Sequence, residues 1–186
     1  MKNKKIGFFG GCFNPPTIAH IELANIAIEY AGLDKLIFVP MGNCYQKDEL
    51  VDFKHRFEML KIATSKFDKI EISDMQINQE HITYAIDSFK KIDEEYKCEK
   101  YFIMGSDNFE KIKNWKSYEE LKKYKFIIFE RNETIENTDN IIHICTKKFK
   151  NVSSKLIREQ MKNNNENIDF IQKEVLKYIQ ENKLYK

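Results

Sequence analysis

The first residues whose types and spacing could support a chemical function lie in the segment "GFFGGCFNPPTIAH", residues 7–20. Thr17 and His20 are three residues apart, so both side chains can face the first turn of a helix that begins near Thr17. The unpaired amides of such a turn, at the positive end of the helix dipole, bind anions. We therefore predict a phosphate site here. Thr17 as a plain N-cap and His20 as a surface residue remain an alternative explanation.

A second segment of this kind is "NVSSKLIREQM", residues 151–161. Ser153 and Ser154 can start a helix and offer hydroxyls beside free backbone amides, and Arg158 follows one turn after Ser154. An ordinary capped amphipathic helix with a solvated arginine would explain the same residues. Two anion sites at helix N-termini in one α/β domain indicate a polyphosphate held between them.

Gly10 and Gly11, in the first of these segments, predict a sharp backbone turn and a close approach of ligand to backbone, because glycine has no Cβ. The segment lacks the Gly-Lys-Ser/Thr of a Walker loop and the GxGxxG of a dinucleotide-binding turn. Neither a Walker-type NTPase nor a nicotinamide-dependent oxidoreductase is therefore supported.

The elements that must position these residues are strands alternating with helices. Most of the apolar runs are nearly continuous, which is typical of strands covered on both faces of a parallel sheet. The predicted strands are residues 5–9, 35–40, 69–73, 100–105 and 125–130, with a weaker sixth candidate at 141–145. The predicted helices lie within residues 18–33, 53–64, 82–96 and the tail 168–186, whose expected buried face is Phe170, Val175, Leu176 and Ile179.

This alternation predicts right-handed crossovers and one α/β domain spanning residues 1–186. We expect a Rossmann-like, doubly wound parallel sheet in the order 3-2-1-4-5, with the sixth candidate strand added and a C-terminal helical portion. Ligands of such sheets bind beyond the carboxyl ends of the strands, where the winding direction reverses. The loop after the first strand should therefore lie beside "MGSDN" (104–108), which follows the fourth.

Composition limits the classes of partner. The 186 residues carry 31 Lys and Arg against 29 Asp and Glu, which argues against a dedicated nucleic-acid or anionic-membrane surface. Four scattered cysteines without a CxxC pair predict free thiols in a reducing compartment. The apolar start is too short for a signal peptide, and no stretch reaches membrane-spanning length. We expect a cytoplasmic protein without nucleic-acid or membrane partners; its oligomeric state is left open.

Several motifs, in order along the chain, resemble those of the HxGH nucleotidyltransferase superfamily. "GGCFNPPTIAH" resembles its GGxFxPxHxGH signature, and "NVSSKLIR" resembles its ISSTxxR motif. Between them, "HRFEML", "TYAIDSF" and "FIMGSDNFEKIKNWKSYEEL" are similar to segments of nicotinate- and nicotinamide-mononucleotide adenylyltransferases, and "YQK" (45–47) to a segment of some branches. The similarity extends over almost the whole chain.

The resemblance implies a reaction in which a phosphate oxygen of nicotinate mononucleotide attacks the α-phosphorus of ATP. Pyrophosphate leaves, and nicotinate adenine dinucleotide, an intermediate of NAD biosynthesis, is formed. Such a transfer needs no protein nucleophile, because catalysis consists mainly of positioning and charge neutralisation. Mg²⁺, held mainly by the ATP phosphates, is the expected cofactor, and no metal site built from side chains is expected.

The resemblance also implies roles for individual residues, with His20 and Arg158 stabilising the transition state. The implied ATP site comprises Gly10, Gly11, Phe13, Thr17, His20, Gly105, Asp107, Ser153, Ser154 and Arg158. The implied mononucleotide site comprises Lys47, Tyr84, Ala85, Asp107 and Trp115. An indole over a cationic pyridine ring is favourable, although Trp115 as a core residue and Lys47 as a solvated lysine remain alternatives.

Two positions depart from the family pattern. Ala19 replaces the glycine of xGH, and Ala85 stands where the enzymes acting on the nicotinate form usually have threonine. The second change leaves nicotinamide mononucleotide, or both mononucleotides, as alternative acceptors. A non-catalytic nucleotide-binding sensor is the alternative from another class, and intact His20, Ser154 and Arg158 argue against it. Pantetheine-phosphate adenylyltransferases and cytidylyltransferases lack the two central motifs and are disfavoured.

Overall fold

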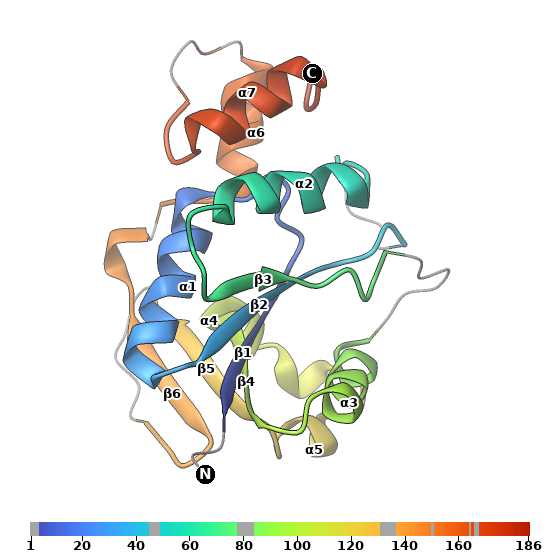
Figure 1. Cartoon of the computed structure of the whole chain (residues 1–186), viewed down its shortest axis with the longest axis vertical. Coiled ribbons are helices and arrows are strands. Elements are labelled where there is room, and N and C mark those ends of the chain that lie inside the picture. The colour runs from blue at the N-terminus through green and yellow to red at the C-terminus, as the bar shows by residue number, and fades with distance from the viewer. Residues whose placement is uncertain are drawn as a thin grey trace.

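The computed structural model describes residues 4–44, 49–77, 84–130, 137–149, 151–163, 165 and 168–186. Within these residues a six-stranded sheet forms the centre of the molecule, in the order β3-β2-β1-β4-β5-β6 (Figure 1). The strands are β1 (Lys5–Gly11), β2 (Lys35–Pro40), β3 (Ile70–Ile72), β4 (Glu99–Gly105), β5 (Lys125–Glu130) and β6 (Ile141–Cys145).

Every pair of neighbouring strands in this sheet is parallel. β1 lies at the centre, where Phe8 is in register with Ile37 of β2 and with Phe102 of β4. The predicted strand order is confirmed, and the weak candidate at 141–145 is a strand that extends the sheet beyond β5. The winding direction reverses between β1 and β4, so the loops after these two strands lie side by side, as predicted.

Helices cover both faces of the sheet. They are α1 (Ile18–Ala31), α2 (Phe53–Thr64), α3 (Ala85–Glu95), α4 (Ser106–Phe109), α5 (Tyr118–Leu121), α6 (Ser154–Lys162) and α7 (Lys173–Glu181), with short 3₁₀ turns η1 (Ile112–Asn114) and η2 (Lys147–Phe149). The first helix ends where Gly32 adopts a left-handed conformation with φ of 62°, as its glycine predicts. Among the described residues, we find no helix with the length and apolarity needed to cross a membrane.

The core has two layers, one on each side of the sheet, because successive strand residues point to opposite faces. Phe9 packs in the layer that contains α1, α2, α6 and α7. Phe8 packs in the other layer, with α3, η1 and α5. Figure 1 shows α6 and α7 beside α2, at the end of the molecule far from the N-terminus. The C-terminal helices therefore belong to the same core layer as the helix that follows β1.

The tail differs from its prediction. Phe170, predicted to be buried, is 42% exposed and adopts a φ of 63° before α7 begins at Lys173. Its backbone carbonyl accepts a hydrogen bond from the amide of Ile18, at a donor–acceptor distance of 2.8 Å. Val175 and Ile179 are buried as predicted. A backbone hydrogen bond thus joins the segment before α7 to the start of α1, and the ring of Phe170 is partly exposed to solvent.

Candidate active site

The chain leaves β1 through a turn that the two glycines do not make. Gly10 and Gly11 both lie within β1, and the turn is formed by Phe13, with φ of 48°, and by a cis peptide bond between Asn14 and Pro15. Glycine is required at position 11 for another reason, because a Cβ there would lie 2.9 Å from Cζ of Phe13. The close approach of a ligand to this backbone stays a prediction, and the predicted position of the turn is wrong.

Thr17 and His20 form a capping box at the N-terminus of α1. The amide of His20 donates to Oγ1 of Thr17 at 3.3 Å, and the amide of Thr17 donates to Nδ1 of His20 at 2.9 Å. Because Nδ1 accepts this bond, a neutral His20 ring carries its hydrogen on Nε2. The ring of Phe13 packs edge-on against the imidazole, with 5.1 Å between ring centroids. The cap thus fixes both the tautomer and the position of the imidazole.

A pocket opens at this helix N-terminus, and we call it the α1–α6 pocket. It is lined by Phe9, Gly10, Gly11, Cys12, Phe13, Thr17, Ala19, His20, Leu23, Gly105, Asp107, Asn108, Phe129, Thr146, Phe149, Val152, Ser153 and Ser154. Nine of the ten residues predicted for the ATP site are therefore brought together, and Arg158 is the tenth. The N-termini of α1 and α6 both lie at this pocket, so two helix dipoles favour an anion there.

Arg158 does not line the α1–α6 pocket. Its Nε donates to a carboxylate oxygen of Glu49 at 2.9 Å, and its Nη1 donates to the carbonyl of Asn14 at 2.9 Å. Lys162 also pairs with Glu49. On the same helix, Ser154 donates to the carbonyl of Pro15 at 2.7 Å. The predicted helix start at Ser153 and Ser154 is thus observed, while the guanidinium lies against the loop after β1 and carries a carboxylate partner.

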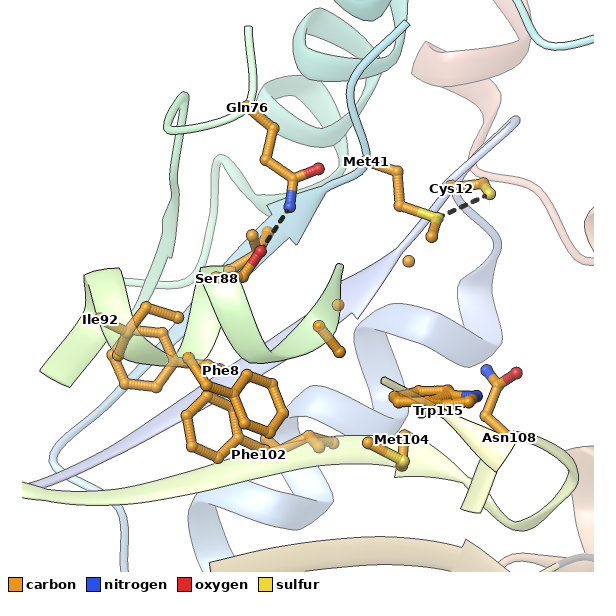
Figure 2. A pocket seen from close by; sticks show the side chains of 16 residues that line it. Phe8, Cys12, Met41, Gln76, Ser88, Ile92, Phe102, Met104, Asn108 and Trp115 are labelled. Carbon is orange, nitrogen blue, oxygen red and sulfur yellow. Dashed lines mark hydrogen bonds between the residues drawn. The ribbon is translucent and has the colours of Figure 1, made fainter. Parts of the chain in front are cut away.

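A second pocket, which we call the α3 pocket, lies on the other side of the end of β1 (Figure 2). It is lined by Phe8, Gly10, Gly11, Cys12, Val39, Met41, Gln76, Ala85, Ser88, Phe89, Ile92, Phe102, Ile103, Met104, Asn108 and Trp115. No charged side chain is among these described residues. Gly10, Gly11, Cys12 and Asn108 line both pockets, so the two cavities meet at the carboxyl end of β1.

The residues predicted for the mononucleotide site are only partly brought together. Ala85 and Trp115 line the α3 pocket, and Figure 2 shows Trp115 and Asn108 at one end of it. Asp107 lines only the α1–α6 pocket. Tyr84 lines neither pocket; it is 49% exposed, with the Nζ of Lys116 4.4 Å from the centre of its ring. Lys47, and with it the "YQK" segment, lies outside the described residues.

Several lining residues were not predicted from the sequence. Asn108 and Cys12 lie inside the segments singled out there, next to residues that were chosen. No sequence motif around Gln76 indicates a functional role. In the structure Gln76 follows β3 and is buried; it accepts from the amide of Gly42 at 3.0 Å and donates to Ser88 at 3.0 Å. Cys12 and Met41 contact each other through their sulfur atoms at 3.3 Å. Only the folded chain brings these residues to the α3 pocket.

Arg56, in α2, makes its hydrogen bonds to oxygen atoms of three segments of the chain. Its side chain is fully buried and donates to the carbonyls of Val51 and Cys12 at 2.9 and 3.0 Å, and to Oδ1 of Asn43 at 3.3 Å. Burial lowers the pKa of the guanidinium. Arg56 therefore holds together the loops that follow β1 and β2.

The family model described as "Cytidylyltransferase-like" matches residues 8–160 of this chain. The fold is also that of a solved structure, "Plasmodium falciparum nicotinic acid mononucleotide adenylyltransferase complexed with NaAD". The two agree with a TM-score of 0.83 over 98% of this chain and 97% of that chain, at 24% sequence identity.

Sequence relatives narrow the family further. A protein of Acholeplasma laidlawii named "Probable nicotinate-nucleotide adenylyltransferase" is 35% identical over 184 residues, which cover 95% of each chain. The Bacillus subtilis "Nicotinate-nucleotide adenylyltransferase" is 32% identical over 187 residues, which cover 98% of each chain. With both phosphate-binding segments of the sequence gathered at one pocket, the chain belongs to the cytidylyltransferase-like family and, within it, to the nicotinate-nucleotide adenylyltransferases.

Proposed function

We propose that this chain transfers the adenylyl group of ATP to nicotinate mononucleotide, giving nicotinate adenine dinucleotide and pyrophosphate. The observation that carries this proposal is the shared wall of the two pockets at Gly10, Gly11, Cys12 and Asn108. Two nucleotides bound in adjoining cavities can bring a phosphate oxygen of one to the α-phosphorus of the other. We further propose that residues 1–186 act as one nucleotidyltransferase domain in the cytoplasm.

ATP would occupy the α1–α6 pocket, with its phosphates at the N-termini of α1 and α6. His20 would donate from Nε2 to a phosphate oxygen, and Ser153 and Ser154 would offer hydroxyls and amides. Arg158 would exchange Glu49 for a phosphate and neutralise charge that develops in the transition state. Thr17 orients His20, and the backbone of Gly10 and Gly11 lets the nucleotide approach β1. Gly105 and Asp107 would border the nucleoside.

The mononucleotide would occupy the α3 pocket, where Trp115 offers an aromatic face to the cationic pyridine ring. Ala85 is the first residue of α3, so backbone amides at this helix start are the groups available to a nicotinate carboxylate. Tyr84 and Lys47 are retained as proposed mononucleotide contacts. Tyr84 would border the pocket mouth, and Lys47 would bind the mononucleotide phosphate.

The transfer itself is an in-line substitution at the α-phosphorus. A new P–O bond forms to the mononucleotide phosphate, the bond to the bridging oxygen of the β-phosphate breaks, and pyrophosphate leaves with the electron pair. The described residues contain no cluster of three or more His, Cys, Asp or Glu that could hold a metal. We propose that Mg²⁺ is held mainly by ATP phosphate oxygens, where it would neutralise charge on the phosphates.

One observation favours nicotinamide mononucleotide as a second acceptor. The described residues that line the α3 pocket are all uncharged, and an amide enters such a pocket at a lower desolvation cost than a carboxylate. The amide of Gln76 and the hydroxyl of Ser88, which Figure 2 shows joined by a hydrogen bond, are polar groups that can pair with either base.

The experiment that tests this function is pyrophosphate release with Mg-ATP and each mononucleotide in turn. A higher kcat/KM for nicotinate mononucleotide supports the proposal, and equal values would make the enzyme dual in specificity. Binding of ATP without turnover of either mononucleotide would overturn the proposal in favour of a nucleotide-binding sensor.

A further inference from the structure

A buried tyrosine near the C-terminal end of the chain contacts the loop after β1. The hydroxyl of Tyr185 donates to Oδ1 of Asn14 at 2.7 Å, across 171 positions of sequence. Tyr185 is 8% exposed and Asn14 is 4% exposed, so the hydrogen bond is shielded from water. A phenylalanine would fill the same space but could not make this hydrogen bond.

Asn14 is the centre of a small network. Its Nδ2 donates to the carbonyl of Glu49 at 2.8 Å, and its Oδ1 also accepts from the amide of Val51 at 3.2 Å. Its own carbonyl accepts from Nη1 of Arg158 at 2.9 Å. Asn14 thus joins the loop that leads to α1, the segment that supplies the carboxylate partner of Arg158, and Arg158 itself.

The Tyr185 hydroxyl is suited to hold this network without joining the chemistry. It lines neither the α1–α6 pocket nor the α3 pocket. Burial raises the pKa of Tyr185, and the nearby Arg158 and Arg56 lower it by less, so the hydroxyl stays a neutral donor at physiological pH. A neutral donor fixes the rotamer of Asn14 and adds no charge beside the two arginines.

We propose that Tyr185 is a positioning residue for the phosphates of ATP. Tyr185 fixes the side chain of Asn14. It thereby fixes the position of the Asn14 carbonyl, which accepts from Arg158, and the backbone conformation between Asn14 and the Thr17–His20 cap. This inference rests on the proposed function in taking Arg158 and His20 as phosphate ligands. Tyr185 acts through Asn14, and it touches no nucleotide.

The test compares Tyr185→Phe with the matched control Tyr178→Phe. The Tyr178 hydroxyl of α7 makes a hydrogen bond with His55 of α2 at 2.9 Å, and neither residue lines the α1–α6 pocket or the α3 pocket. We expect Tyr185→Phe to lower kcat/KM for ATP about three- to tenfold, with the KM for the mononucleotide changed less than about twofold. Tyr178→Phe should leave both values at the wild-type level. Equal effects of the two variants would overturn the proposal.

A double-mutant cycle tests whether the effect passes through Asn14. Asn14→Ala keeps the backbone carbonyl that holds Arg158 but removes the acceptor of the Tyr185 hydroxyl. In that background, Tyr185→Phe should cause no further loss of kcat/KM for ATP. A loss as large as in the wild-type background would show that Tyr185 acts by another route.

Calorimetric titration with a non-hydrolysable ATP analogue separates this inference from the proposed function. If the wild type turns over neither mononucleotide, the proposed function fails. Weaker analogue binding by Tyr185→Phe than by Tyr178→Phe would still support a positioning role. A lower melting temperature with unchanged affinity for the analogue would reduce Tyr185 to a structural residue and overturn the inference.

Discussion

The imidazole of His20 is held in place by Thr17, the N-cap residue of the same helix. The amide of Thr17 donates to Nδ1 of the imidazole, so a neutral ring carries its hydrogen on Nε2, and His20 lines the α1–α6 pocket. The cap and the proposed phosphate ligand are therefore parts of one arrangement. The N-cap at Thr17 is observed, and it is compatible with the proposed phosphate contact of His20.

Replacing His20 with alanine should separate catalysis from folding. We expect kcat to fall about a hundredfold or more, because a preorganised donor to the reacting phosphates is lost. The melting temperature should fall by only about 2 to 4 °C, which corresponds to the loss of one cap interaction of about 1 kcal/mol. His55→Ala, in a residue that lines neither pocket, is the control. An unchanged kcat in the folded His20 variant would remove His20 from the site.

Trp115→Ala should act on one substrate only. We expect the KM for the mononucleotide to rise about tenfold, because stacking on the pyridine ring is lost, while the KM for ATP changes little. Trp115→Phe, which keeps an aromatic face, should recover much of the loss. Steady-state kinetics with each substrate varied in turn provide the measurement. Equal increases in both KM values would contradict placement of the pyridine ring against Trp115.

At the scale of residues, the sequence predicts which side chains share one turn of a helix. Thr17 with His20, and Ser153 with Ser154, follow from spacing alone, because neighbouring turns fix their geometry. The pairing of Arg158 with Glu49 spans 109 positions and depends on how α6 packs, so spacing could not reveal it. Gln76 reaches the α3 pocket for the same tertiary reason.

At the scale of elements, the strands were the most predictable feature. Nearly continuous apolar runs define a sheet buried on both faces, and even the weak run at 141–145 pairs in register with β5. The exit from β1 was less predictable. Glycines usually mark turns, but here Gly11 is dictated by the ring of Phe13, and Phe13 itself takes the positive φ.

Strands β4 and β5 are joined by a pH-sensitive contact at Glu99. Its carboxylate accepts from Nζ of Lys125 at 2.7 Å and from the hydroxyl of Tyr101 at 2.8 Å, and these hydrogen bonds lower the pKa of Glu99 below its ordinary value of 4.5. Because the pKa of Glu99 is lower in the folded than in the unfolded chain, its ionised carboxylate stabilises the fold at pH values above 4.5. The stabilisation is lost as the pH falls through the folded-state pKa.

Glu99→Gln should therefore lower the melting temperature at pH 7 by about 2 °C and remove part of its acid dependence. The difference between wild type and variant should shrink as the pH falls below the ordinary value of 4.5 and through the lowered pKa of Glu99. Melting curves from about pH 7 to pH 3 measure it. Glu71→Gln, in a carboxylate that is 53% exposed and pairs with Lys35, is the control for loss of a surface ion pair. A constant difference across the range would contradict the prediction.

At the scale of the whole molecule, long polar side chains join loops that are distant in sequence. Arg56 joins the loops after β1 and β2 to the segment before α2, while Tyr185 and Arg158 join the C-terminal region to Asn14. The strand order, both core layers and the C-terminal helical portion were predictable from patterning. These ties were not, because each depends on where a long polar side chain ends after folding.

Arg56→Met should destabilise the whole fold. The variant keeps most of the side-chain volume but leaves the buried carbonyls of Val51 and Cys12 without their donor, and we expect the free energy of unfolding to fall by about 2 to 4 kcal/mol. Denaturant unfolding measures the change. Lys54→Met, an exposed substitution on the same helix, should change it by less than about 0.5 kcal/mol. A loss of activity at wild-type stability would instead indicate direct contact with substrate.

The carboxylate of Glu49 pairs with both Arg158 and Lys162, so in the unliganded molecule it neutralises one of these two positive charges. If a phosphate binds Arg158 as proposed, it replaces the carboxylate of Glu49, so one anion is exchanged for another. An incoming monoanion gains little from such an exchange, since it offers no more charge than the carboxylate it displaces. A triphosphate can hold Arg158 while its other oxygens engage the helix N-termini. We therefore expect Glu49 to favour a triphosphate over a small monoanion at Arg158.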